Sequence, residues 1–99
     1  MTYKIQFTKS ALSQLGALKA NERASLVEKI ETHLSHEPSV NSRNRKPLRP
    51  NPLAPRELRV GKLRAFYDVE NDKTRVVNIL AIGKKVGNKL YIEDQEIQI

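Results

Sequence analysis

Arginine and lysine are the residue types of this chain whose number and spacing could support chemistry. The segment from residue 43 to residue 64 carries eight basic residues and one acid, a net charge of +7 that equals the formal net charge of the whole chain. The basic residues are Arg43, Arg45, Lys46, Arg49, Arg56, Arg59, Lys62 and Arg64. Positive charge concentrated in this way on a small chain predicts a polyanionic partner, most often a nucleic acid.

Two arginines of this segment are expected to face each other across a β-hairpin. The pair Gly61-Lys62 is typical of a two-residue type II′ turn, and this turn places Arg59 opposite Arg64. Like charges in direct cross-strand positions repel each other unless an anion lies between them. Either Glu57 and Asp68 neutralise the pair locally, or the arginines bind a phosphate, whose oxygens match the guanidinium fork. We favour the phosphate site.

Other kinds of catalytic site find little support in the sequence. The chain has no cysteine, and His33 and His36 lie three residues apart on an expected helix with no third ligand indicated, so we expect no metal and no cofactor. Arginine, lysine and tyrosine remain, a set that can bind a phosphodiester and neutralise charge on its oxygens. If the substrate is RNA, its own 2′-hydroxyl can be the nucleophile. Tyr91 could stack on a base or exchange a proton, or it could simply fill the edge of the sheet.

The first part of the chain predicts a strand and two helices. Residues 3–7 alternate between apolar and polar side chains, which is typical of a strand with one buried face. Thr8 can cap a first helix that runs to about Lys19, and Asn21 can cap a second helix that ends before Pro38. Apolar residues recur at helical spacing in both segments. The two helices should therefore form an antiparallel hairpin that covers a sheet.

The rest of the chain predicts loops and strands. Residues 38–55 contain all five prolines, which remove backbone donors and indicate a loop or a bent edge segment. The hairpin at residues 57–69 is followed by a turn at 71–73 and by an apolar, β-branched run at 75–82 that is typical of a central strand. We expect Gly83 to end that strand, before a basic loop and a short strand that begins near Leu90.

The two faces of the hairpin are expected to differ. Alternation directs one set of side chains to the core, namely Leu58, Val60, Leu63, Ala65, Tyr67 and Val69. The opposite face would carry Glu57, Arg59, Arg64, Phe66 and Asp68. We expect this second face to be partly open, because the helices cover the other one.

These elements together predict an α+β fold. An N-terminal strand precedes an antiparallel helical hairpin, which packs on a mostly antiparallel β-sheet because the helical connection is the only long one. Ninety-nine residues suffice for one modest core, so we expect a single domain over residues 1–99. No apolar run approaches the roughly 20 residues of a membrane span, and the N-terminus lacks a signal-peptide apolar region. We therefore expect a cytoplasmic protein that does not bind a membrane.

The hairpin also carries a resemblance to a known family. The segment ELRVGKLRAFYDV at residues 57–69, followed by a central strand, IGKK and Tyr91, resembles the RelE/ParE superfamily of bacterial toxins. The opening strand, FTKSALSQL and the two helices fit as well, so the resemblance covers almost the whole chain. It implies a RelE/ParE-like fold and a small cytoplasmic toxin, bound by a cognate antitoxin in a hetero-oligomer. RelE-type members cleave ribosome-bound mRNA without a metal, whereas ParE-type members poison DNA gyrase.

The resemblance also implies roles for individual residues. Arg64 falls on the phosphate-stabilising arginine of the family, Lys85 on the place of a second arginine, and Tyr91 on a C-terminal tyrosine. We therefore expect Arg64, Lys85 and Tyr91 to be the catalytic residues. A further set of cations is expected to hold RNA, namely Lys46, Arg49, Arg56, Arg59, Lys62 and Lys84.

Two positions depart from the family pattern. RelE-type enzymes carry two lysines before the arginine, one of them a candidate general base, and these places hold Pro55 and Glu57 here. The nearby Arg56 and Arg59 stay protonated and are poor bases. Our first hypothesis is a toxin that cleaves mRNA on the ribosome. The alternative is a ParE-like gyrase inhibitor or a catalytically weak relative that acts mainly through antitoxin binding, and a third hypothesis is a nucleic-acid-binding module without toxicity.

Overall fold

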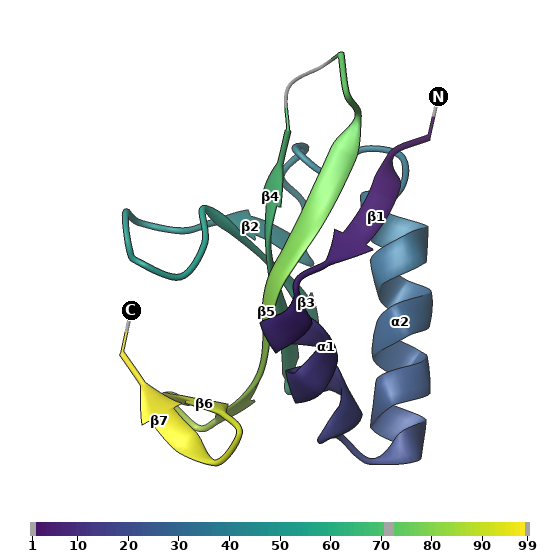
Figure 1. Cartoon of the computed structure of the whole chain (residues 1–99). Coiled ribbons are helices and arrows are strands. Elements are labelled where there is room, and N and C mark those ends of the chain that lie inside the picture. The colour runs from purple at the N-terminus through teal and green to yellow at the C-terminus, as the bar shows by residue number, and fades with distance from the viewer. Residues whose placement is uncertain (1, 71–72, 99) are drawn as a thin grey trace.

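The helices and strands follow the predicted order in a computed structural model that describes residues 2–70 and 73–98. Their bounds are β1 Lys4–Phe7, α1 Lys9–Gly16, α2 Ala20–Leu34, β2 Arg45–Pro47, β3 Arg56–Val60, β4 Leu63–Val69, β5 Val76–Val86, β6 Lys89–Ile92 and β7 Gln95–Ile97. Both helices lie on one side of the sheet, and the loop between β2 and β3 extends on the other side (Figure 1). The predicted α+β class is confirmed.

The central strand of the sheet is β5. The strand order is β2-β3-β4-β5-β6-β7, and β1 pairs with β5 outside this path. The pairing of β1 with β5 is parallel and the other pairs of the described sheet are antiparallel. Along β5, residues 76–79 pair with β1 and residues 84–86 pair with β6. An interval of β5 between these two neighbours is therefore left without a strand partner on that edge.

Side chains of the first helical segment fill this interval. Gln14 Oε1 accepts a hydrogen bond of 2.8 Å from the backbone N–H of Ile82, and Thr8 Oγ1 donates one of 3.3 Å to the carbonyl of Leu80. Buried backbone groups need such partners, so the two contacts replace the missing strand. Thr8 also caps α1 as predicted, since Oγ1 accepts from the backbone N–H of Ala11 at 3.0 Å.

The second helix begins two residues earlier than predicted. Its N-cap is Lys19 and not Asn21. The carboxylate of Glu22, in the first turn, accepts a hydrogen bond of 3.3 Å from the backbone N–H of Lys19. This is half of a capping box, which stabilises a helix start even where the cap residue itself has no small polar side chain. The helix ends at Leu34, four residues before Pro38.

The β3–β4 hairpin has the predicted register. Val60 pairs with Leu63, Arg59 with Arg64. Gly61 has a φ of +59°, in the left-handed region that the first central position of a type II′ turn requires. The apolar side chains that were assigned to the core face are buried or half-buried against the helices, where they pack with Leu26, Ile30 and Leu34 of α2. The turn chemistry therefore sets which face of the sheet each side chain occupies.

The burial of Phe66 shows that the second face of the hairpin is less open than predicted. The side chain is fully buried in a second apolar cluster with Ala54, Ala81 and Leu90. The proline-rich segment and β6 supply this cover. What remains open on this side is the part of the hairpin near the turn, where Arg59 is exposed.

The central strand also runs further than predicted. It continues through Gly83 to Val86. A Cβ atom at Gly83 would lie 3.0 Å from both Leu90 Cδ1 and the carbonyl oxygen of Tyr91, so this glycine lets β6 approach β5 closely and does not end the strand. The predicted turn at residues 71–73 includes two residues, 71 and 72, that lie outside the described part of the chain. None of the described helices is long and apolar enough to cross a membrane.

Candidate phosphate-binding face

Three cations from three neighbouring strands lie on the face of the sheet that points away from the helices. Arg59 of β3 and Arg64 of β4 are direct cross-strand partners, and Arg64 pairs in turn with Gly83 of β5. Lys85 is two residues beyond Gly83, and because alternate residues of a strand share a face, its side chain lies on the same face. The backbone N–H of Lys85 donates a 2.7 Å hydrogen bond to the carbonyl of Lys62, which joins β5 to the turn.

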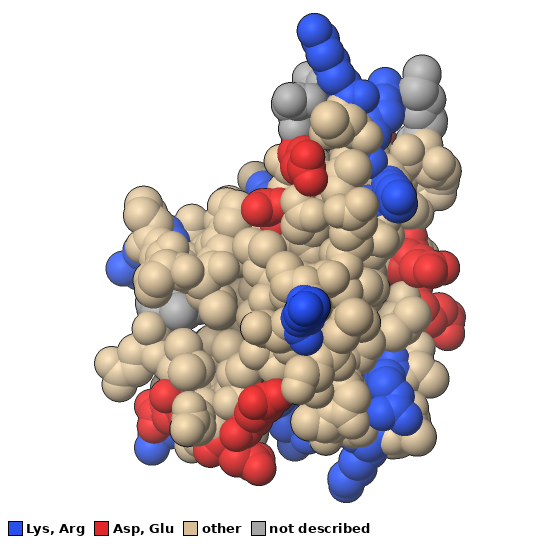
Figure 2. Space-filling view, in the orientation of Figure 1, with Lys and Arg blue, Asp and Glu red and all other residues tan. Residues whose placement is uncertain are grey.

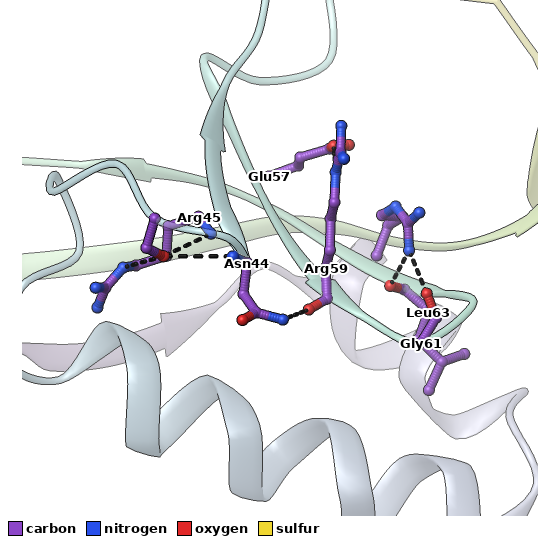
Figure 3. A network of polar contacts seen from close by, with 8 residues as sticks. Asn44, Arg45, Glu57, Arg59, Gly61 and Leu63 are labelled. Atoms are coloured by element: carbon purple, nitrogen blue, oxygen red, sulfur yellow. Dashed lines mark hydrogen bonds and ion pairs between the residues drawn. The ribbon is translucent and has the colours of Figure 1, made fainter.

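Arg59 is neutralised by a buried carboxylate. Its Nε donates to Glu57 Oε2 at 2.6 Å, and the two side chains lie side by side on β3 (Figure 3). The Glu57 side chain is only 7% exposed, whereas that of Arg59 is 46% exposed. Asn44 Nδ2 donates to the carbonyl of Arg59 at 2.8 Å and fixes the strand beside the pair. The local neutralisation considered from the sequence thus holds for Arg59 and Glu57.

Arg64 is held by backbone carbonyls and not by a carboxylate. Its Nη1 donates to the carbonyls of Gly61 at 2.7 Å and Leu63 at 2.9 Å, both at the turn (Figure 3). Its Nε is buried without a hydrogen-bond partner among the described residues. Burial lowers the pKa of Arg64, the charge of Glu57 partly offsets this, and Arg59 adds to the lowering. A buried donor without a partner is costly, and an anion at this position would satisfy it.

Asp68 does not neutralise Arg64. One of its carboxylate oxygens accepts a hydrogen bond of 2.9 Å from Asn78 Nδ2 on β5. Glu57 is therefore the carboxylate that acts on the arginine pair, and it is bonded to Arg59. The arginine pair keeps net positive charge on this face, which is the condition for binding an anion.

A groove of about 420 Å³ runs beside Arg59 and Lys85, and Arg64 is not among the residues that line it. Arg59, Lys85 and Glu57 line it together with Phe66, with Leu48 from the proline-rich side and Glu96 from β7. Figure 2 shows acidic side chains gathered at the lower left, over the β6–β7 end of the molecule. The groove thus combines an apolar floor, a cationic wall and an acidic end, and its volume is in the range of small ligand pockets.

Three further cations that were predicted to bind nucleic acid lie around this face. Lys46 is the cross-strand partner of Glu57 and so lies on the same face. Lys62 is exposed in the turn, and Arg49 is exposed in the proline-rich loop, where it borders a separate depression of about 440 Å³. These residues lie at the borders of the face formed by Arg59, Arg64 and Lys85.

Arg56 is engaged on the helix side. Its Nε donates to the hydroxyl of Tyr67 at 3.2 Å and its Nη2 to Asn41 Oδ1 at 2.9 Å, and its guanidinium carbon lies 6.0 Å from the centre of the Tyr67 ring. The Tyr67 hydroxyl donates in turn to the carbonyl of Pro38 at 2.7 Å. This network joins β3 to the segment that follows α2. Arg56 is therefore not brought together with Arg59 and Arg64.

Lys84 and Tyr91 also lie on the helix side. They are cross-strand partners on β5 and β6, and Lys84 Nζ forms an ion pair of 3.0 Å with Glu22 of α2. Both line a cavity of about 220 Å³ beside the helices. The register therefore separates Tyr91 from Arg64 and Lys85 by the thickness of the sheet, so the prediction that these three residues form one site is not met.

The two histidines are not part of a metal-binding cluster. Among the described residues, no group of three or more histidine, cysteine, aspartate or glutamate side chains could hold a metal ion. The carbonyl of His33 accepts a 2.8 Å hydrogen bond from Arg45 Nη1, which satisfies the C-terminal end of α2. Burial lowers the pKa of His33, and the charges of Arg45 and Lys29 add to the effect.

Comparison with known proteins agrees with this fold. The model of the ParE toxin family, from the type II toxin–antitoxin system parDE, matches residues 5–86. The chain is similar to a chain of the RelBE2 toxin–antitoxin complex from Mycobacterium tuberculosis, with 30% identity and a TM-score of 0.70 over 86% of this chain and all of that chain. No curated protein sequence matches significantly.

Two other solved structures are similar to this one. The isolated RelE toxin of E. coli shares 25% identity, with a TM-score of 0.65 over 83% of each chain. An archaeal RelE–RelB complex from Pyrococcus horikoshii shares 26% identity, with a TM-score of 0.67 over 88% of this chain and 98% of that chain. The chain is therefore a toxin of the RelE/ParE superfamily of type II toxin–antitoxin systems. Within that superfamily, the family model that it matches is that of the ParE toxins.

Proposed function

We propose that this toxin inhibits translation by binding ribosome-bound mRNA on the face formed by Arg59, Arg64 and Lys85, and by cleaving it there. The observation that carries the proposal is the state of Arg64. Its Nη1 is fixed by two carbonyls, and its buried Nε lacks a partner in the described part of the chain. A donor held in place before the substrate arrives can stabilise charge that develops on a phosphate.

The RNA supplies the nucleophile in this proposal. The 2′-hydroxyl attacks the adjacent phosphorus and the 5′-oxygen leaves, which yields a 2′,3′-cyclic phosphate and a 5′-hydroxyl. Arg64 and Lys85 stabilise the negative charge on the non-bridging oxygens. Arg59, Lys46 and Lys62 bind the phosphate chain, so binding weakens as salt concentration rises.

A cognate antitoxin is the proposed protein partner. The similar RelBE2 and RelE–RelB structures are toxin–antitoxin complexes. The open end of the hairpin and the groove beside it carry unbalanced positive charge, which suits an acidic segment that folds across them. The proposed assembly is a hetero-oligomer in the cytoplasm, where it would keep the toxin from the ribosome.

The second candidate is a ParE-type gyrase inhibitor, or a catalytically weak toxin that acts mainly through antitoxin binding. Three observations favour it. The register places Tyr91 on the other face of the sheet from Arg64, and Glu57 stands where RelE-type enzymes carry a lysine. The matching family model is also that of ParE toxins. This candidate predicts intact mRNA after induction, with DNA breaks or with no toxicity.

Primer extension on cellular mRNA separates the two candidates. The toxin is induced without its antitoxin, beside an Arg64→Ala variant and a Lys29→Ala variant that removes one positive charge from the exposed side of α2. We expect growth arrest and new 3′-truncated messages with the parent and with Lys29→Ala, and neither with Arg64→Ala. Growth arrest with intact messages and broken DNA would instead establish the gyrase inhibitor.

A further inference from the structure

Cleavage by the 2′-hydroxyl needs a group that accepts its proton, and the cations of the face are poorly suited to this role. Arginine stays protonated in proteins, and lysine is charged at neutral pH unless its surroundings neutralise it. We propose that Glu57 is the proton acceptor, and that Arg59 releases it when the phosphate of the substrate binds. This inference rests on the proposed function, and it assigns the proton transfer to a carboxylate at a position where RelE-type enzymes carry a lysine.

The position of Glu57 is the first argument. Its carboxylate is buried, yet it lines the groove together with Lys85 and Arg59. One oxygen, Oε2, is bonded to Arg59, and the other, Oε1, receives no hydrogen bond from the described residues. A carboxylate with one fixed and one available oxygen can keep its orientation while the available oxygen takes a proton.

The unequal exposure of the ion pair is the second argument. Arg59 is nearly half exposed, so its guanidinium can turn toward a phosphate in the groove, whereas Glu57 cannot leave its buried place. The carboxylate would then lose its cationic partner and gain an anionic neighbour. Both changes favour protonation of a carboxylate and make it a stronger base. Substrate binding itself would therefore activate the proton acceptor.

The neighbouring candidates fit less well. Asp68 is bonded to Asn78, and Tyr91 lies on the helix side of the sheet. Glu96 also lines the groove but is exposed on β7, where water stabilises its charge. Glu57 is thus the carboxylate of this groove that is buried and that receives a hydrogen bond on only one of its oxygens from the described residues.

The proton and electron balance of the step is complete. The proton of the 2′-hydroxyl moves to a Glu57 oxygen as the 2′-oxygen forms a bond with phosphorus. The bond between phosphorus and the 5′-oxygen breaks, and the 5′-oxygen takes both electrons of this bond and a proton from the Lys85 ammonium. Exchange with water then returns Glu57 to the carboxylate and Lys85 to the ammonium.

The test is single-turnover cleavage of mRNA on purified, programmed ribosomes with the Glu57→Gln variant. The amide keeps an acceptor for Arg59 but cannot take the proton. We expect the cleavage rate to fall by a factor of about 10² to 10⁴, the usual contribution of a general base, while binding to the ribosome is unchanged or tighter. Glu28→Gln, which removes the same charge from the exposed side of α2, should cleave like the parent.

The outcomes separate this inference from the proposed function. Cleavage by Glu57→Gln at the parent rate overturns the inference and leaves the proposed function intact. A parent toxin that binds programmed ribosomes without cleaving mRNA overturns both. Glu57→Asp keeps a carboxylate that is one methylene shorter, and a rate between those of the parent and Glu57→Gln would support proton transfer over a structural role.

The pH dependence of the parent rate decides the case even if the variants do not fold. The charged or titratable groups that surround Glu57 are Lys46 of β2, Arg59 of β3, Arg64 of β4, Lys85 of β5, Lys89 of β6 and Glu96 of β7. Carboxylates ionise on the acid side of neutrality and lysines on the alkaline side. A rate that rises on the acid side and then levels off supports Glu57. A rate that rises only on the alkaline side assigns the role to a lysine and overturns the inference.

Discussion

Arg59 and Arg64 form the second cross-strand pair from the hairpin turn, and their guanidinium groups have different partners. Arg59 shares its charge with the buried carboxylate of Glu57, and Arg64 directs its guanidinium to the carbonyls of Gly61 and Leu63. Carbonyls reduce the repulsion between the arginines without cancelling charge. The hairpin therefore keeps a cation that an approaching phosphate can neutralise.

Replacing Arg64 should affect catalysis far more than stability. We expect Arg64→Ala to lower the single-turnover cleavage rate by a factor of about 10² to 10³, the cost of losing one fixed donor to a developing oxyanion. Its free energy of unfolding should change by no more than about 1 kcal/mol, because lost hydrogen bonds and relieved repulsion oppose each other. Arg64→Lys keeps the charge but lacks the guanidinium fork, so its cleavage rate should lie between those of the parent and Arg64→Ala. Cleavage by Arg64→Ala at the parent rate would show that Arg64 is not a catalytic residue.

Tyr91 should matter little for cleavage. Its side chain shares the helix side of the sheet with Lys84, whereas Arg64 and Lys85 lie on the other side. We expect Tyr91→Phe to cleave ribosome-bound mRNA within a few-fold of the parent rate, since proton transfer by a positioned group is worth about 10²-fold or more. A fall of that size would show that the Tyr91 hydroxyl reaches the substrate, against the register seen here.

Gly83 should be intolerant of a side chain. In Gly83→Ala the new Cβ would meet Leu90 and the carbonyl of Tyr91 at 3.0 Å, and moving β6 away should cost about 1–3 kcal/mol. Gly16→Ala is the matched control, because nothing lies within 4 Å of its Cβ position at the end of α1. That change should be neutral or stabilising by up to about 1 kcal/mol. Urea unfolding measures both, and equal stabilities would contradict the close approach of β5 and β6.

The hydroxyl of Tyr67 should stabilise the fold. Tyr67→Phe leaves the carbonyl of Pro38 without its 2.7 Å hydrogen bond and the Nε of Arg56 without its acceptor, which should cost about 1–2 kcal/mol. Burial raises the pKa of Tyr67 above the ordinary tyrosine value of 10.0, although Arg56 opposes the shift. The raised pKa means that the neutral phenol is favoured in the folded state. This contribution is complete below pH 10 and is lost as pH rises through the folded value.

The pH dependence of thermal stability tests the contribution of the Tyr67 hydroxyl. Thermal melts of the parent and of Tyr67→Phe should differ most near neutral pH, and the difference should shrink above pH 10. A difference that stays constant up to pH 11 or so would mean that the phenol titrates as it does in the unfolded chain.

Local chemistry accounts for what could be predicted from the sequence. Gly61 needs a left-handed backbone, so the turn, the register and the pairing of Arg59 with Arg64 follow from one residue. Thr8 caps α1 through its own side chain. Such features depend on neighbours within four residues, which a single sequence displays.

The features that were missed depend on distant neighbours or on a rule applied too narrowly. Phe66 is buried because the proline-rich segment folds over it, and no local pattern reveals that cover. Glu57 was considered as a neutralising charge and not as part of the site, although it is the one acid of the basic segment. The side of the sheet on which Tyr91 lies could have been predicted from the sequence. Gly87 has a φ of +62° in a two-residue turn like that of Gly61, and the same reasoning pairs Lys84 with Tyr91.

The parallel pairing of β1 with β5 has a consequence for synthesis of the toxin. Phe7 pairs with Ile79, and α1 is joined to the same strand through Gln14 and Ile82. Contacts between residues so far apart form slowly and only after the intervening chain exists. A nascent chain must therefore extend through β5 before the helices have a sheet to cover. A chain that ends before β5 lacks the strand with which β1 pairs and to which Gln14 bonds.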